Sequence, residues 1–227
     1  MDSTALLTLF RGNMNDAVAP YFWSDPEVYA YMDDAFKMFA RMTGGIADFT
    51  TTAVVDVPIV AATPIATLHS SILRIMSATR ASDGGEIRII NSTDMPIDHS
   101  SDYGSLRPLF VNNTPGPVGY MIIGAERGKV RWIQPPLLND TANLYVYRLP
   151  LQQLTAAGQS LAEIGAEHHF HLLKWMQHLA YLKQDSEIYD KGRSDEQKAA
   201  FVDYCALAKA EVERYKHKTR VTAYGGI

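Results

Sequence analysis

The sequence predicts an α+β protein: an antiparallel helical bundle of N- and C-terminal helices, an inserted small antiparallel β domain and an extended C-terminal tail. Apolar residues recur every three or four positions near both ends of the 227-residue chain, as on one face of a helix. In the middle this period disappears, and short β-branched runs alternate with turn residues. We therefore expect N-terminal helices in 1–47, a β-rich insert in 48–150, a helical hairpin in 151–216 and an extended tail in 217–227.

The first helical part contains a short helix at about Thr4–Leu9 and a stronger one after residue 24. The run Ser24-Asp25-Pro26-Glu27 has the pattern of a capping box with proline in the first turn, and Gly44-Gly45 predicts the end of the helix. The aromatic run Tyr21-Phe22-Trp23 just before this box is typical of a packed helix entrance rather than of a ligand platform.

The middle of the chain predicts a small, largely antiparallel sheet or barrel with a hairpin turn at Ala125–Lys129. Its polar, Pro- and Gly-rich stretch Ser92–Pro117 predicts a long exposed loop that is functional or mobile. The six expected strands are Thr51–Val57, Ile72–Met76, Glu86–Asn91, Gly119–Ile123, Val130–Ile133 and Asn143–Tyr147.

The last third predicts a helix pair, Glu167–Gln184 and Ser194–Lys218, with an S-x-x-Q capping box at the start of the second helix. The first helix has a second apolar face made by Trp175, Tyr181 and Leu182. Because such a helix is usually buried between neighbours, we expect these three residues to pack within the domain or between subunits.

Composition restricts the possible functions. A net charge of −4 argues against a generally basic nucleic-acid binder, and the single cysteine, Cys205, excludes a disulfide framework and favours a reducing compartment. The N-terminus lacks a basic region before its short apolar run, and no segment has the length of a membrane span, so we expect a soluble, unprocessed protein without a membrane partner.

Chemical motifs are scarce. The chain has no G-x-S-x-G elbow, P-loop or H-E-x-x-H pattern, and we expect no enzyme activity, catalytic residue, metal or cofactor. Two alternatives stay open: a metal-dependent enzyme that uses Glu167, His168 and His171, and a nucleic-acid-binding module that uses the basic C-terminal helix end. The basic residues are Arg214, Lys216, Lys218 and Arg220.

Three segments carry a resemblance to a known family. They are Phe22–Val28 with Asp34-Ala35, the run Tyr147–Leu151, and Trp175–Tyr181 followed by the K-Q-D-x-E-x-Y-D stretch Lys183–Asp190. Together with the order of the predicted elements, they resemble the head-to-tail adaptor proteins of tailed bacteriophages over nearly the whole chain.

The resemblance implies a non-enzymatic virion protein of the neck, between head and tail, which is present in the host cytoplasm during assembly. It implies a homo-oligomeric, dodecameric ring whose partners are the portal protein and a tail or nozzle protein, and through which DNA passes without sequence-specific binding. It also implies that the C-terminal segment docks on the portal. The residues expected to do so are Arg220, Val221, Tyr224, Gly225, Gly226 and Ile227. Independently, a segment with Val221, Tyr224 and Ile227 but no core of its own needs a partner surface to become ordered.

Overall fold

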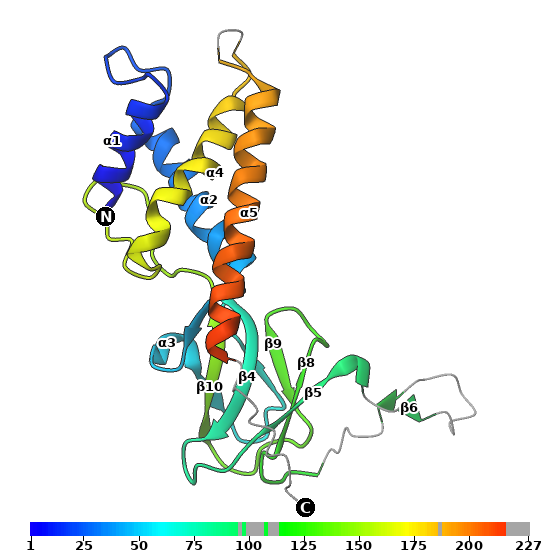
Figure 1. Cartoon of the computed structure of the whole chain (residues 1–227). Coiled ribbons are helices and arrows are strands. Elements are labelled where there is room, and N and C mark those ends of the chain that lie inside the picture. Colours follow the sequence, from blue (N-terminus) through cyan, green and yellow to red (C-terminus); the bar gives the residue numbers. More distant parts are fainter. Residues whose placement is uncertain (95–96, 99–106, 109–113, 186–187, 217–227) are drawn as a thin grey trace, which may run out of the picture. The chain divides into compact units, whose positions relative to one another are not determined.

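The structure is a computed structural model that describes residues 1–94, 97–98, 107–108, 114–185 and 188–216. Two compact units make up the chain: a helical unit, Met1–Ile46 with Pro150–Ile227, and a β unit, Ala47–Leu149 (Figure 1). The mixture of helices with two sheets rich in antiparallel pairs confirms the predicted α+β class. Among the described residues, no helix is long and apolar enough to cross a membrane.

The helical unit is a bundle whose core combines residues from both ends of the sequence. Its elements are α1 (Ser3–Asn13), α2 (Asp25–Thr43), the 3-10 turn η2 (Ala166–His168), α4 (His169–Tyr181) and α5 (Lys191–Lys216). Fully buried side chains of Phe10, Phe36, Leu172 and Phe201 meet in this core, one from each long helix. The segment before α4 adds Leu154 and Leu161, which are also fully buried.

The observed caps explain where α2 begins and ends. Ser24 is the N-cap residue but makes no side-chain capping hydrogen bond, whereas the Glu27 carboxylate accepts a hydrogen bond from the Ser24 backbone N–H, so only half of the predicted capping box forms. Pro26 lies in the first turn, and Gly44 ends the helix with a left-handed φ of 98° that suits glycine. Trp23 is buried and packs edge-to-face on Phe10, with ring centroids 5.8 Å apart, which confirms the packed helix entrance.

The start of α5 corrects the predicted capping box at Ser194. The helix begins at Lys191, and the Asp190 carboxylate accepts a hydrogen bond from the Arg193 N–H (3.0 Å). Ser194 is instead fully buried, where its hydroxyl donates to the His178 carbonyl (3.0 Å) and contacts the His178 ring at 2.8 Å. An aspartate one turn earlier therefore takes the position that serine was expected to hold.

The β unit contains two four-stranded sheets. In the first, β10 lies between β1 and β2 and also pairs with β4, and in the second the order is β3-β9-β8-β5. β10 pairs antiparallel with β2 and β4, as do β3 with β9, β6 with β7 and β8 with β9, whereas β5 and β8 run parallel. The elements are β1 (Ile46–Asp48), α3 (Thr52–Val55), β2 (Asp56–Ile59), β3 (Ile65–Thr67), β4 (Ile72–Arg80), β5 (Arg88–Asn91), η1 (Ser92–Asp94), β6 (Ile97–Asp98), β7 (Arg107–Pro108), β8 (Tyr120–Ile123), β9 (Lys129–Trp132) and β10 (Asp140–Arg148).

Five of the six predicted strands coincide with β4, β5, β8, β9 and β10, and the Ala125–Lys129 turn joins the antiparallel pair β8 and β9. The expected strand Thr51–Val57 is wrong in its first half, which forms α3. The Asp48 carboxylate accepts hydrogen bonds from the Thr50 and Thr51 N–H groups (3.0 Å each), and this local turn outcompetes the extended backbone that β-branched residues favour. The predicted loop Ser92–Pro117 contains η1, β6 and β7, and much of it lies outside the described residues.

A buried ion pair joins the first and last strands of the β unit. Arg148 Nε donates to the Asp48 carboxylate at 2.5 Å, and both side chains are more than nine-tenths buried. Burial opposes ionisation of Asp48, but the Arg148 contact and hydrogen bonds from Thr50 and Thr51 hold its pKa well below the usual range. We refer to this pair as the Asp48–Arg148 clamp.

Candidate interaction surfaces

The α4–α5 hairpin is the best-packed part of the helical unit. The α4 seam of Leu172, Leu173 and Met176 is buried, as predicted, and meets Phe201 and Cys205 of α5. Burial raises the pKa of the Cys205 thiol to about 12, so this cysteine stays protonated and acts as a small apolar core residue.

The three residues expected to form the second apolar face of α4 have different surroundings. Trp175 is 6% exposed, lies 5.2 Å from Phe201 between ring centroids, and donates from Nε1 to the Asp34 carboxylate at 2.7 Å. Tyr181 is half-buried, and Leu182 is 39% exposed. Within one copy of the chain, therefore, Leu182 offers the most free surface of the three and Trp175 the least.

The loop after α1 and the turn before α5 lie at the same end of the helical unit (Figure 1). They enclose a pocket of about 380 Å³, which we call the tip pocket. It is lined by Asn13, Met14, Asn15, Phe22, Trp23, Tyr181, Ile188, Tyr189, Asp190 and Arg193. The tip pocket was not predicted from the sequence, because its walls come from segments more than 150 residues apart. The exposed aromatic rings of Phe22 and Tyr189 are the signal that could have indicated it.

Ion pairs hold the loop of the tip pocket in place. Arg11 is buried, donates to the Asp16 carboxylate (2.6 Å) and the Trp23 carbonyl (3.1 Å), and also contacts Asp25. Lys183 Nζ donates to the Phe22 carbonyl at 2.8 Å, which links the loop to the end of α4. The pocket is therefore a fixed feature of the bundle end.

The histidines near the start of α4 are used within the bundle. His168 Nδ1 lies 2.8 Å from the Tyr204 hydroxyl, and the His171 ring stacks on Tyr204 with centroids 3.4 Å apart. His169 Nε2 hydrogen-bonds the Leu161 and Ile164 carbonyls. In the part of the chain that the structure describes, no three His, Cys, Asp or Glu side chains form a group able to hold a metal ion. The Glu167 carboxylate lies 3.6 Å from His168 Nε2.

A comparison with protein families decides what kind of protein this is. The model of the SU10 adaptor protein family matches residues 1–223. The chain belongs to this family. Among curated proteins, no sequence matches it.

Membership confirms the resemblance to phage head-to-tail adaptors. The adaptor is thus a structural protein of a bacteriophage virion, and its family is not a family of enzymes. The residues expected to bind the portal, Arg220, Val221, Tyr224, Gly225, Gly226 and Ile227, lie outside the described residues, as does Lys218 of the basic helix end. The surfaces that the structure does describe are those of the bundle and of the β unit.

Proposed function

We propose that the adaptor forms a closed, dodecameric ring that joins the portal vertex of the phage head to the tail or nozzle, with residues 217–227 docked on the portal. The observation that best supports a ring is the distribution of apolar residues on α5. This helix buries Phe201 and Cys205 against its own bundle and also exposes Val202 and Leu207, the latter by 64%. Apolar side chains around a helix indicate that more than one face is covered in the functional state.

Ring closure turns modest contacts into a stable assembly. Burying one exposed leucine contributes roughly 1.5–3 kcal/mol, which is small against the cost of association. A closed ring repeats the same contact at every interface, so no subunit is left with an uncovered face. Leu182 on α4 and Leu207 on α5 are the exposed residues that we assign to this contact, and Trp175 and Tyr181 support it from within the bundle.

The C-terminal segment is the proposed portal anchor. It follows α5 directly and contains Val221, Tyr224 and Ile227 for insertion into an apolar crevice, with Arg220 for an acidic neighbour. Ordering backbone costs roughly 1–2 kcal/mol per residue, so the anchors must bury well for docking to be favourable. Because many copies of the segment dock at once, the overall affinity of the ring for the portal is high even if each segment binds weakly.

The net charge of the subunit is compatible with passage of DNA through the ring. A subunit with a net charge of −4 repels DNA phosphates overall. A ring channel that repels DNA weakly would let the DNA slide through it. Sequence-specific binding is not part of the proposal.

The test is deletion of residues 219–227. We expect loss of binding to the purified portal, measured by co-sedimentation, with an unchanged helical circular dichroism signal. A control variant with the same tail residues in scrambled order should also fail to bind. Portal binding that survives the deletion would refute the proposed anchor. Ring formation is tested separately by Leu207→Asp, which should shift the adaptor to smaller species in analytical ultracentrifugation.

A further inference from the structure

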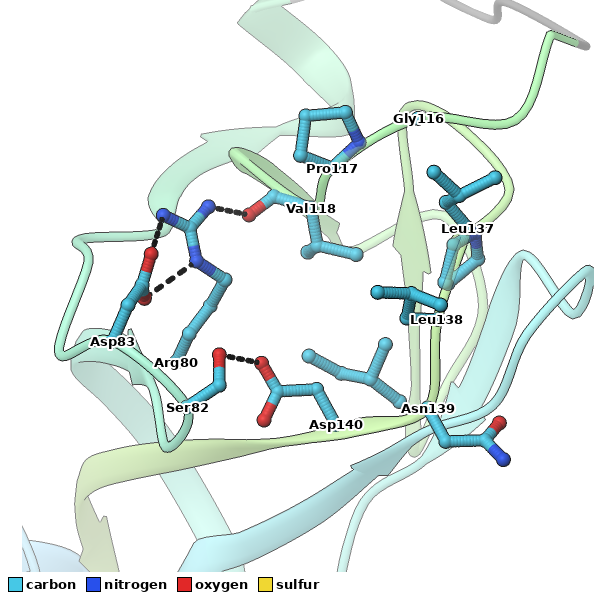
Figure 2. A pocket seen from close by; sticks show the side chains of 12 residues that line it. Arg80, Ser82, Asp83, Gly116, Pro117, Val118, Leu137, Leu138, Asn139 and Asp140 are labelled. Carbon is cyan, nitrogen blue, oxygen red and sulfur yellow. Dashed lines mark hydrogen bonds and ion pairs between the residues drawn. The ribbon is translucent and has the colours of Figure 1, made fainter.

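The β unit has a groove of about 430 Å³ on its surface (Figure 2). It lies between the turn that follows β4, residues 116–118 ahead of β8, and the connection from β9 to β10. Its lining is largely apolar: Ile59 is buried, and Pro117, Val118, Pro136, Leu137 and Leu138 surround it.

Two adjacent leucines that line this groove are highly exposed. Leu137 is 61% and Leu138 is 74% exposed, and Figure 2 shows the side chains of Val118 and Leu138 directed toward the middle of the groove. Such exposure in a connection between strands leaves apolar surface uncovered in the isolated chain.

Hydrogen bonds hold the connection from β9 to β10, which contains both leucines, in place. Leu137 N–H donates to the Gly116 carbonyl (3.1 Å), and Gly116 N–H donates to the Pro135 carbonyl (3.0 Å). Ala62 N–H donates to the Pro136 carbonyl (2.8 Å), and Ala61 N–H donates to Asn139 Oδ1 (2.8 Å). The groove is therefore preformed, which lowers the entropic cost of binding.

One side of the groove carries an excess of negative charge. Arg80 donates to the Asp83 carboxylate (2.9 and 2.7 Å) and to the Val118 carbonyl (2.7 Å), and it also attracts Asp140, so one arginine faces two carboxylates. Asp140 accepts from the Ser82 hydroxyl (2.6 Å) and the Thr141 N–H (2.8 Å), and these hydrogen bonds lower its pKa, so it is ionised at neutral pH. Among the ion pairs of the described residues, none includes Asp140.

This combination defines the partner. An apolar groove whose lining has two carboxylates and one arginine fits an apolar side chain next to a cation, whereas nucleic acid would bring phosphates against Asp83 and Asp140. From this charge complementarity we infer that a polypeptide segment of a neighbouring virion protein docks here. It inserts an aliphatic or aromatic side chain between Val118 and Leu138 and places a lysine or arginine beside Asp140.

The inference rests on the adaptor's place in the virion but not on the docking of its C-terminal segment. The test uses assembled virions whose adaptor carries the photo-crosslinking residue p-benzoylphenylalanine at position 138. The matched control carries it at position 49, because Phe49 is also highly exposed (71%) in the same unit.

We expect position 138 to crosslink, at least tenfold more than position 49, to a segment of another virion protein with a lysine or arginine within three residues of the crosslinked site. Asp140→Asn, which keeps the acceptor for Ser82, should lower this yield at least threefold while circular dichroism stays unchanged. Equal yields at both positions, crosslinks to a second copy of the adaptor, crosslinks to a segment without a nearby cation, or insensitivity to Asp140→Asn would each overturn the inference. Deletion of residues 219–227 is measured by portal binding in solution and not by this crosslinking. The portal anchor and the groove can therefore each be refuted without the other.

Discussion

The helical unit and the β unit differ in how the chain forms them. The helical unit joins residues 1–46 to the last third of the chain, whereas the β unit is one continuous segment. Each contains a buried arginine ion pair, but Arg11 and Asp16 are five residues apart and fix a loop locally, while Asp48 and Arg148 are 100 residues apart. Distant parts of the helical unit are held together by apolar packing and by a partly exposed ion pair between Lys183 and Glu27 (2.8 Å), whereas in the β unit the long-range ion pair is buried.

The substitution expected to have the largest effect on stability is Asp48→Asn. Removing one charge of a buried pair leaves the other uncompensated, at a cost of roughly 3–5 kcal/mol. We expect this loss in the free energy of unfolding of the β unit, measured by amide hydrogen exchange in β10, with α4 little affected. Because the pKa of Asp48 is lowered in the folded state, the stability it confers is present above about pH 4 and is lost as pH falls further.

The control for the clamp is Asp83→Asn in the same unit. Asp83 also pairs with an arginine, Arg80, but its side chain is 54% exposed and screened by water. If Asp48→Asn lowers the free energy of unfolding no more than Asp83→Asn does, the clamp does not stabilise the β unit as proposed.

A smaller effect in the helical unit comes from Trp175→Phe. This change keeps the ring packing on Phe201 but removes the hydrogen bond to Asp34, so we expect a loss of about 1–3 kcal/mol in the stability of the bundle. Denaturant unfolding measures it, and Val18→Ser, at a loop residue that is 81% exposed, serves as the surface control. If Trp175→Phe instead changes the oligomeric state and leaves subunit stability unaltered, Trp175 acts mainly between copies.

The smallest expected effect is a pH dependence confined to the helical unit. Burial lowers the pKa of His178 despite an opposing hydrogen bond to the Ser194 carbonyl, and burial and nearby cations lower that of His171. The unfolded chain binds these protons first, so the bundle should lose stability as pH falls below about 6.5. Thermal unfolding of the chain between pH 7.5 and 5.5 measures this slope, and His178→Gln should flatten it. A parallel slope in the variant would assign the effect to other groups.

Sequence reasoning succeeded where the signal was local or strongly periodic. The core seam of α4, the glycine that ends α2 and the position of β10 follow directly from residue type and spacing. It failed at the start of α5, where Asp190 and Ser194 both have capping residue types and only tertiary packing of Ser194 decides between them. It also missed β1 and β3, because three-residue strands carry too few side chains to show a pattern.

The interaction surfaces were harder to predict than the fold. The tip pocket and the groove at Leu138 both form between loops that are distant in sequence, and nothing in the spacing of residues shows which loops meet. The consecutive leucines at 137 and 138, between Pro136 and Asn139 in a turn, are the one local signal for the groove. Apolar residues in a turn are unusual enough to suggest a contact beyond the chain itself.

The Asp48–Arg148 clamp has a consequence for how this family can diversify. Since β1 and β10 are neighbours in one sheet, the insert begins and ends at the same place. A domain whose ends meet can be lengthened, shortened or exchanged as a cassette without requiring its host to move. The clamp would thus allow a phage to acquire a new β unit, with a new groove, while the helical bundle keeps its own sequence.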